Sequence, residues 1–265
     1  MTLIQIIVLA LIQGLTEFLP VSSSAHLILG SRVFGWPDQG LVFDVATHLG
    51  TLLAVLIYFR HELIEMARAC VSPVRNDQDR QHRKLAIYLI VASVPALLAG
   101  FAARDLVELF LRDVRVIAWA TIGFGLLLWL ADAIGSRQRK LEDISLKDAL
   151  LIGLMQALAL VPGVSRSGVT ITAGRFLGLS PDAAARFSFL LAIPIISAAG
   201  GYGALRVALG DAPIDWVQFG LAMGLAALAG WVCVAAFLAL LKRVGLMPFV
   251  VYRLLLGVAL IWMLN

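Results

Sequence analysis

The stretch 13-QGLTEFLPVSSSAH-26 interrupts an apolar region near the N-terminus with a glutamate, a proline, three serines and a histidine. Proline removes a backbone donor and breaks a helix. Non-helical backbone within a bilayer is tolerated only where it is buried in protein or lines a wet cavity. We therefore expect two half-helices over about residues 3–34, which turn back inside the protein, rather than one membrane span.

The whole chain has the composition of a membrane protein. Of its 265 residues, 61% are hydrophobic and only 14% are charged, whereas charged residues make up about 25% of an ordinary soluble domain. A spanning helix needs roughly 20 apolar residues. Six runs meet this requirement, at about 43–60, 85–103, 115–134, 182–205, 216–241 and 247–264. The sequence therefore predicts an all-α polytopic membrane protein.

A second broken region, about residues 147–180, carries the cluster 162-PGVSRSGVT-170. Each half of the chain, 1–134 and 147–265, then consists of one re-entrant helix–loop–helix segment and three spans. Because the halves start from opposite sides, we expect an inverted-topology repeat within a single membrane domain. The two breaks would meet near the midplane, where such folds place their sites.

The distribution of Lys and Arg orients this arrangement. Most of them fall on one face, largely in the loops near 60–84, 135–147 and 242–243. The positive-inside rule makes that face cytoplasmic and leaves both termini outside. The net charge of +4 and the pI near 9.4 are then explained without a nucleic-acid partner. Cys70 and Cys233 have neither disulfide nor metal-ligand spacing, and we expect two free thiols.

The first half-helix carries a buried acid. Gln13 and Glu17 lie four residues apart and therefore share one face. A carboxylate at this depth needs a cation or hydrogen-bond donors beside it, and either a divalent metal or Arg166 would serve. The alternative is a structural glutamate that pairs across the repeat interface.

The serine cluster that follows suggests nucleophilic chemistry. Ser22, Ser23 and Ser24 precede His26 closely enough for a serine hydroxyl to pass its proton to the imidazole, which would make that serine a nucleophile. Serine hydroxyls also cap half-helices or bond across helices, so each serine alone is a weak indication. Their placement beside Glu17 favours the functional interpretation.

The second break supplies an anion-binding nest. Arg166 offers a planar fork that matches phosphate oxygens, and the half-helix that starts here adds its positive N-terminal dipole. The other candidate binding residues are Ser165, Ser167, Gly168 and Thr170, with Gly163 allowing close backbone approach. Arg166 could instead pair with Glu17, which would not exclude phosphate binding.

Three further polar residues lie within spans. Asp44 and His48 share a face near the outer end of the first span, where they could relay protons, bind metal or lie at an interface. Arg253 in the last span could snorkel or pair internally. The sequence leaves these alternatives open.

The motifs QGLTEFLPVSSSAH and PGVSRSGVTIT together resemble the two signatures of the bacterial undecaprenyl-pyrophosphate phosphatase family, the bacitracin-resistance proteins. The similarity extends through FDVATHLGTLLAV, SVPALLAG, FSFLLAIP and MPFVVYRLLLG, and thus covers nearly the whole chain. The acid-phosphatase-like lipid phosphatases fit poorly, because no histidine follows Arg166.

The resemblance implies an inner-membrane enzyme, with its site facing the periplasm, that removes the terminal phosphate of undecaprenyl pyrophosphate. The product is the lipid carrier for peptidoglycan and other envelope polymers. It also implies a divalent metal, Mg²⁺ or Ca²⁺. By their positions in the motifs, the resemblance implies that Glu17, Ser23, His26 and Arg166 are catalytic. Glu17 and Gln13 would bind the metal, and Ser22 and Ser24 would lie beside the substrate. Two departures are visible: Gln13 stands where some members have Glu, and Ala25 stands where many members have Gly.

We expect Ser23 to attack phosphorus with His26 as base, or else a water activated by Glu17 or His26. A homodimer is also open. The rival hypothesis is a polyprenyl-phosphate transporter or flippase, because inverted repeats with broken helices are typical of transporters. A carrier binds its anion but needs neither a nucleophile nor a base.

Overall fold

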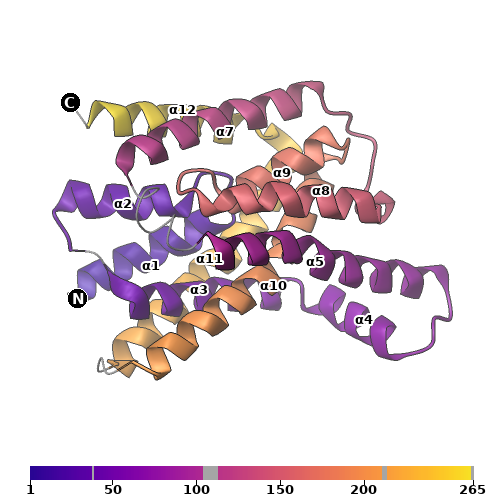
Figure 1. The fold of residues 1–265 in the computed structure, drawn as a ribbon, viewed down its shortest axis with the longest axis horizontal. Helices are drawn as coiled ribbons and strands as arrows, with labels where there is room; N and C mark the ends of the chain where they lie inside the picture. Colours follow the sequence, from indigo (N-terminus) through magenta and orange to yellow (C-terminus); the bar gives the residue numbers. More distant parts are fainter. Residues whose placement is uncertain (38, 104–112, 211–213, 264–265) are drawn as a thin grey trace.

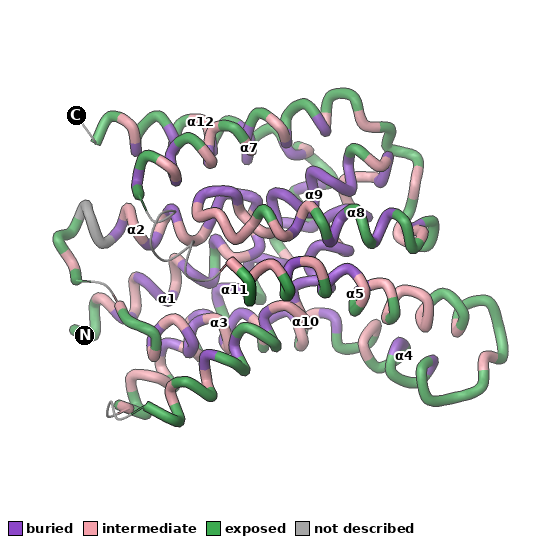
Figure 2. The backbone as a smooth tube through the Cα atoms, in the orientation of Figure 1, coloured by how far each residue is buried: buried purple, intermediate pink, exposed green. Residues whose placement is uncertain are grey.

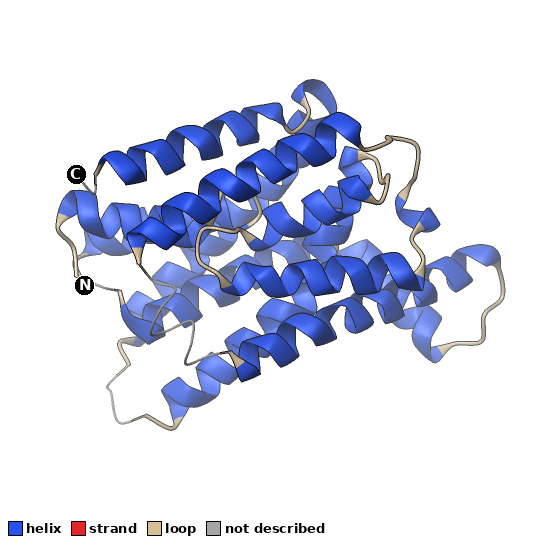
Figure 3. Ribbon diagram, turned by 45° about the horizontal axis from the view of Figure 1, so that its top comes forward, coloured by secondary structure: helices blue, strands red, loops and turns tan. Residues whose placement is uncertain are grey.

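A computed structural model describes residues 1–37, 39–103, 113–210 and 214–263 of the chain. Its helices are α1 (Leu3–Glu17), α2 (Ser23–Phe34), α3 (Gly40–Tyr58), α4 (Arg60–Val71), α5 (Asp77–Ala102), α7 (Val114–Ile134), α8 (Leu146–Ala157), α9 (Arg166–Phe176), α10 (Pro181–Ala208), α11 (Trp216–Val244) and α12 (Met247–Trp262), with the short 3-10 helices η1 (Leu141–Asp143) and η2 (Leu158–Leu160). Figure 3 shows these helices packed side by side, with most of the connecting loops toward the two ends of the bundle.

The predicted all-α polytopic membrane architecture is confirmed. Five helices are long and apolar enough to cross a membrane, namely α3, α5, α7, α10 and α11. The sixth predicted span, 247–264, corresponds to α12, whose 16 residues are fewer than a full crossing needs. Its predicted last residue, 264, lies outside the described residues.

The cytoplasmic loop predicted between the first two spans is more helical than expected. Residues 60–71 form α4, and α5 begins at Asp77, well before the apolar run. Asn76 explains the early start, because its side chain accepts a hydrogen bond from the Asp79 backbone N–H and caps the helix. The capped polar start thus lengthens α5 well beyond its apolar run.

Both predicted breaks are present. α1 ends at Glu17 and α2 begins at Ser23, while α8 passes through η2 into a turn before α9 begins at Arg166. In Figure 1, the α1–α2 pair enters from the end of the bundle that holds both termini, and the α8–α9 pair enters from the opposite end. Ser22 and Ser165 each precede the returning half-helix with φ near +70°, at 71° and 70°. The inverted duplication itself stays a prediction. If it is correct, it would explain why the two turns match.

Side chains fix where most of the helices start. Thr2 and Ser145 form capping boxes with residues three positions on, at the starts of α1 and α8. Asp113, Ser180 and Asp215 cap α7, α10 and α11 through their side-chain oxygens. Capping therefore fixes the residue at which each re-entrant pair begins, at the start of α1 and at the start of α8.

Burial is concentrated around the re-entrant segments. Figure 2 shows buried backbone at the centre of the bundle, with exposed residues along the outer helices. α9 is the extreme case, since it is buried from Ser167 to Arg175. Large apolar side chains such as Trp119, Leu228 and Val258 are exposed on the outer helices, as expected for a surface that faces lipid.

The C-terminal end of α9 is anchored to the linker between the halves. Arg175 is fully buried and donates to Asp132 Oδ1 at 2.9 Å and to the carbonyls of Gly135 and Ser136. Nearby, the hydrogen bond with Asp148 raises the pKa of the Arg139 guanidinium. These contacts fix the depth at which the second loop meets the first.

Small residues let α11 approach the first re-entrant helix and α3 closely. A Cβ on Gly14 would lie 2.7 Å from the Ala226 carbonyl oxygen, and one on Gly50 would lie 2.3 Å from that of Met223. Backbone atoms cannot move aside cheaply, so only glycine fits at either position. Small residues at helix contacts are a common means of close packing between membrane helices.

We predict that Gly50→Ala destabilises the protein by about 1–3 kcal/mol, because the added methyl overpacks the α3–α11 contact. Thermal unfolding in detergent, followed by size-exclusion chromatography, measures the effect. Gly224→Ala is the matched control, since a Cβ there meets nothing within 4 Å. Equal midpoints for the two variants would show that the contact does not limit stability.

Candidate active site

The two loops meet through an ion pair. Arg166 Nη2 lies 3.2 Å from Glu17 Oε1, and the two side chains are only 11% and 10% exposed. Arg166 Nη1 donates to the Ser188 carbonyl at 2.9 Å, and its guanidinium lies over the Phe18 ring. The sequence left open whether Arg166 pairs with Glu17 or faces an anion. The observed pairing uses only some of the N–H donors of the Arg166 guanidinium. The N-terminus of α9 begins at the same residue.

Ser23 points at the same carboxylate. Its Oγ donates to Glu17 Oε2 at 2.9 Å, and Gln13 Nε2 donates to that oxygen at 3.0 Å. Glu17 thus accepts from the serine on one oxygen and from Arg166 on the other. A carboxylate in this position can take the hydroxyl proton, which makes Glu17 the base nearest to Ser23.

His26 lacks the hydrogen bond to Ser23 that the expected serine–histidine pair requires, because both of its ring nitrogens have other partners. Its Nδ1 lies 2.7 Å from the Ser22 carbonyl oxygen, which can only accept, so Nδ1 carries the proton. Its Nε2 lies 2.6 Å from the Tyr252 hydroxyl, and the two rings are parallel to within 2°. Because α2 starts at Ser23, the helix carries the imidazole away from the serine and toward α12.

The remaining hydroxyls mostly hold the two loops together. Ser167 Oγ donates to the Leu19 carbonyl at 2.8 Å, and the Gly163 backbone N–H donates to Ser24 Oγ at 3.4 Å. Thr170 Oγ1 lies 2.7 Å from Ser188 Oγ. The hydroxyl hydrogens of Ser167 and Thr170 therefore go to protein acceptors, and both side chains hold the second loop in position.

Ser22 and Ser165 occupy the strained turn positions. Ser22 Oγ lies 3.1 Å from Ser24 Oγ, while Ser165 Oγ lies 3.2 Å from Ser167 Oγ and accepts from the Gly168 N–H at 3.1 Å. A positive φ in a residue other than glycine persists only where surrounding contacts hold it. These bonds aim the first residue of each returning helix, Ser23 in one and Arg166 in the other.

Arg253 joins both loops from α12, which settles the question that the sequence left open. It is fully buried and donates to the carbonyls of Pro20 at 3.3 Å, Val164 at 3.0 Å and Gly163 at 2.9 Å. Gly168 makes room for it, since a Cβ there would lie 2.7 Å from Arg253 Nη1. Gly168 therefore serves the approach of the arginine, and its contact with substrate stays a prediction.

The residues expected at the metal fit a cation. Gln13 Oε1 is buried without a hydrogen-bond partner, while Nε2 of the same amide donates to the Glu17 carboxylate. Gln13 Nε2 also lies 3.4 Å from His48 Nε2. No cluster of three His, Cys, Asp or Glu side chains converges within the described parts of the chain, so a metal here depends on the amide oxygen as well.

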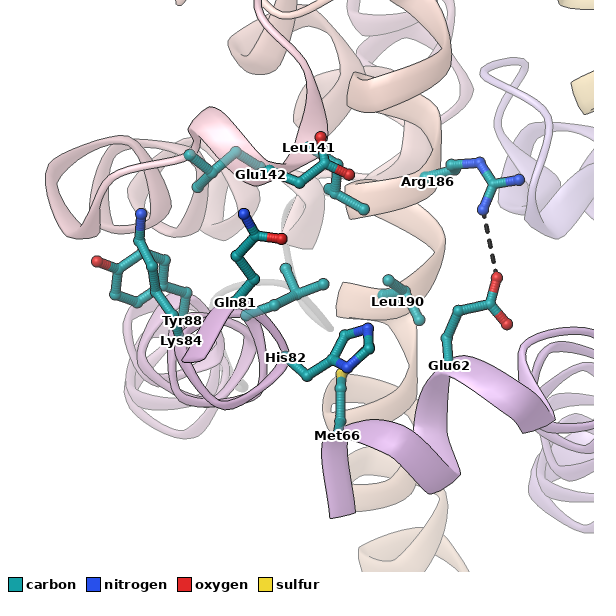
Figure 4. A pocket seen from close by; sticks show the side chains of 12 residues that line it. Glu62, Met66, Gln81, His82, Lys84, Tyr88, Leu141, Glu142, Arg186 and Leu190 are labelled. Carbon is teal, nitrogen blue, oxygen red and sulfur yellow. Dashed lines mark hydrogen bonds and ion pairs between the residues drawn. The ribbon is translucent and has the colours of Figure 1, made fainter. Parts of the chain in front are cut away.

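A separate pocket of about 170 Å³ lies between α4, α5, α10 and η1. Figure 4 shows Arg186 directed at Glu62, and their ion pair measures 3.4 Å. Lys84, His82 and Glu142 also line it. This mixed and partly paired set of charges lies apart from the two loops, which bring the serine and the carboxylate together.

Sequence reasoning missed two members of the site. Tyr252 and Ser188 lie on α12 and α10, far from either motif along the chain, and contact His26 and Arg166 respectively. Tyr252 precedes Arg253 in the segment MPFVVYRLLLG, and that similarity was the one available signal. Nothing in the spacing identifies Ser188.

The fold and site together define a multi-pass membrane protein with a partly buried acid, serine and arginine delivered from two re-entrant loops. The family described as bacitracin resistance protein BacA matches residues 6–259. A relative from Teredinibacter turnerae, named undecaprenyl-diphosphatase, is 52% identical over 98% of both chains. Undecaprenyl-diphosphatase 2 of Stutzerimonas stutzeri is 53% identical over 98% of both. The chain belongs to this bacitracin-resistance family.

We predict that Arg253→Met lowers the free energy of unfolding by at least about 2 kcal/mol, because several buried carbonyls lose their donor at once. Arg253→Lys retains one charged donor group and should fall between Met and wild type. Thermal unfolding in detergent gives the order. Arg243→Met, at an exposed position of α11, is the control, and equal losses at both positions would refute the role of Arg253 in joining the loops.

Proposed function

We propose that the chain is an undecaprenyl-diphosphatase, which hydrolyses undecaprenyl pyrophosphate to the monophosphate carrier and inorganic phosphate. The observation that carries this proposal is the Glu17 carboxylate, which contacts both the Ser23 hydroxyl and the Arg166 guanidinium. Family membership and the names of relatives about half identical over the full chain support it. A transporter would have no use for a serine held on a carboxylate.

The biological setting follows from that activity. The monophosphate is the lipid carrier for peptidoglycan and other envelope polymers, and its recycling would give resistance to bacitracin. We place the protein in the bacterial inner membrane, with the site open to the periplasm, because the first loop enters from the face with fewer basic residues. A homodimer is compatible with this arrangement and forms no part of the site.

Substrate binding uses the second loop. Arg166 would exchange part of its contact with Glu17 for the pyrophosphate oxygens, which it matches in geometry and charge. Helices α2 and α9 both begin at the site, so the positive ends of their dipoles would face the bound pyrophosphate. Most of the acceleration in phosphoryl transfer comes from such positioning and charge neutralisation.

Glu17, rather than His26, is the base for Ser23 in this account. Ser23 Oγ attacks the terminal phosphorus and its proton passes to Glu17 Oε2. The bond from phosphorus to the bridging oxygen breaks, and that oxygen leaves with the lipid monophosphate. Water then attacks the phosphoserine; one water proton stays on the phosphate and the other goes to solvent, while Glu17 returns its proton to Ser23.

The expected divalent metal would be held by Glu17 and Gln13, and when bound it would neutralise charge on the transferred phosphoryl group. The orphaned Gln13 oxygen supports this assignment. A direct attack by water, activated by Glu17 or by His26 Nε2, is the variant route. It differs from the serine route in leaving no phosphoprotein.

We predict that purified wild-type protein releases phosphate from a polyprenyl pyrophosphate in detergent with Mg²⁺, and that Arg166→Met lowers kcat by at least about 10²-fold. Glu17→Gln and Ser23→Ala should do the same, because each removes one partner of the proton transfer. Rapid quenching with labelled substrate should trap phosphoserine in the wild type.

The control for folding is Arg186→Met, which removes a cation from the separate pocket at α10. Turnover that survives Ser23→Ala, without any trapped phosphoprotein, would replace the covalent route by the water route. Absence of phosphate release from well-folded wild-type protein would favour the transporter.

We also predict that Tyr252→Phe lowers kcat and leaves KM nearly unchanged, because the ring still stacks on His26 but no longer donates to Nε2. Steady-state kinetics measure the change. If Tyr252 acts by positioning His26, adding Tyr252→Phe to His26→Ala should have no further effect. An undiminished effect of Tyr252→Phe in that background would separate the tyrosine from the histidine.

A further inference from the structure

His48 lies beside the proposed metal residues although neither motif contains it. It comes from the middle of α3, and its Nε2 is 3.4 Å from Gln13 Nε2. Its Nδ1 lies 2.7 Å from the Asp44 carbonyl oxygen, so the ring donates there and keeps a lone pair on Nε2. Such an outer hydrogen bond is how proteins orient a metal-binding imidazole.

The Gln13 amide stands between His48 and Glu17. Its nitrogen points at both, 3.0 Å from Glu17 Oε2 and 3.4 Å from His48 Nε2, while its oxygen is buried without a partner. A half turn of the amide exchanges the two atoms. The oxygen would then face two further acceptors, and a cation bound between the three would stabilise that arrangement.

The spacing of these acceptors suits one ion. Ligands about 2.1 Å from a metal are separated by about 3 Å from their neighbours around an octahedron. The distances of 3.0 and 3.4 Å from the Gln13 amide are of this size. The three side chains would thus form part of one coordination sphere, with water or phosphate oxygens for the rest.

We propose that His48 completes a mixed oxygen and nitrogen cation site with Glu17 and Gln13, and that it shifts the preference of this site from Ca²⁺ toward Mn²⁺. Calcium takes oxygen ligands, whereas an imidazole nitrogen favours first-row transition metals. Gln13 supplies no charge, so this site has a single carboxylate. The imidazole offsets that loss for a metal that accepts nitrogen.

The inference rests on the proposed function for the presence of a metal, but its test measures binding alone. Mn²⁺ binding to purified full-length protein in detergent is followed by electron paramagnetic resonance, with Mg²⁺ and Ca²⁺ as competitors. The variants are His48→Ala, which removes the donor, and His48→Gln, which substitutes an oxygen donor. His61→Ala on α4, an exposed residue, is the matched control.

We expect His48→Ala to weaken Mn²⁺ binding by about tenfold or more, with a smaller loss for Ca²⁺. His48→Gln should recover Ca²⁺ affinity without recovering Mn²⁺ affinity, and His61→Ala should match wild type. Unchanged Mn²⁺ binding in His48→Ala, an equal loss for both metals, or absence of Mn²⁺ binding by the wild type would overturn the proposal. A wild type that binds Mn²⁺ in this pattern but releases no phosphate would refute the phosphatase alone.

Discussion

The ion pair between Glu17 and Arg166 is the contact on which the arrangement of the two loops depends. Each charge would be costly alone at this depth, because desolvation penalises an unpaired carboxylate or guanidinium. Each comes from a helix that had to be broken to bring it there. The pair therefore accounts for both interruptions at once, and it gives the loops a reason to meet.

The rest of the bundle holds that meeting point in place. Arg253 binds backbone carbonyls of both turns, and Arg175 fixes the far end of α9 to the linker. Gly14 admits α11 close to the first half-helix, and Gly50 admits it close to α3. Two serines with positive φ turn the chain so that the next residues, Ser23 and Arg166, point into the site. Polar groups inside the membrane are thus tied to protein partners from several directions.

Much of the architecture could be predicted from the sequence because the bilayer leaves few choices. The lengths of the apolar runs predict the membrane spans, and a proline beside clustered hydroxyl side chains predicts each of the two helix breaks. The failures occur where length is a poor guide: α12 is shorter than predicted, and α4 and the start of α5 form in polar sequence under local capping.

The site was less predictable because its geometry depends on distant segments. Spacing placed His26 within reach of Ser23, but the direction of α2 sends the ring to Tyr252 instead. The sequence shows His48 only as a polar residue within a span. The packing of α3 against α1 is what brings it close to Gln13. Ser24 and Ser167, which were expected beside the substrate, bond across the two loops, and their contact with substrate stays a prediction. A motif therefore identifies the chemical groups, whereas the fold decides which of them face one another.

A double-mutant cycle on kcat/KM with Glu17→Gln and Arg166→Met tests most directly whether the two loops form one site. If they do, the double variant is scarcely worse than the poorer single variant, because either change already disables the shared site. Strictly additive losses would contradict the account, since they would mean that the two residues act independently.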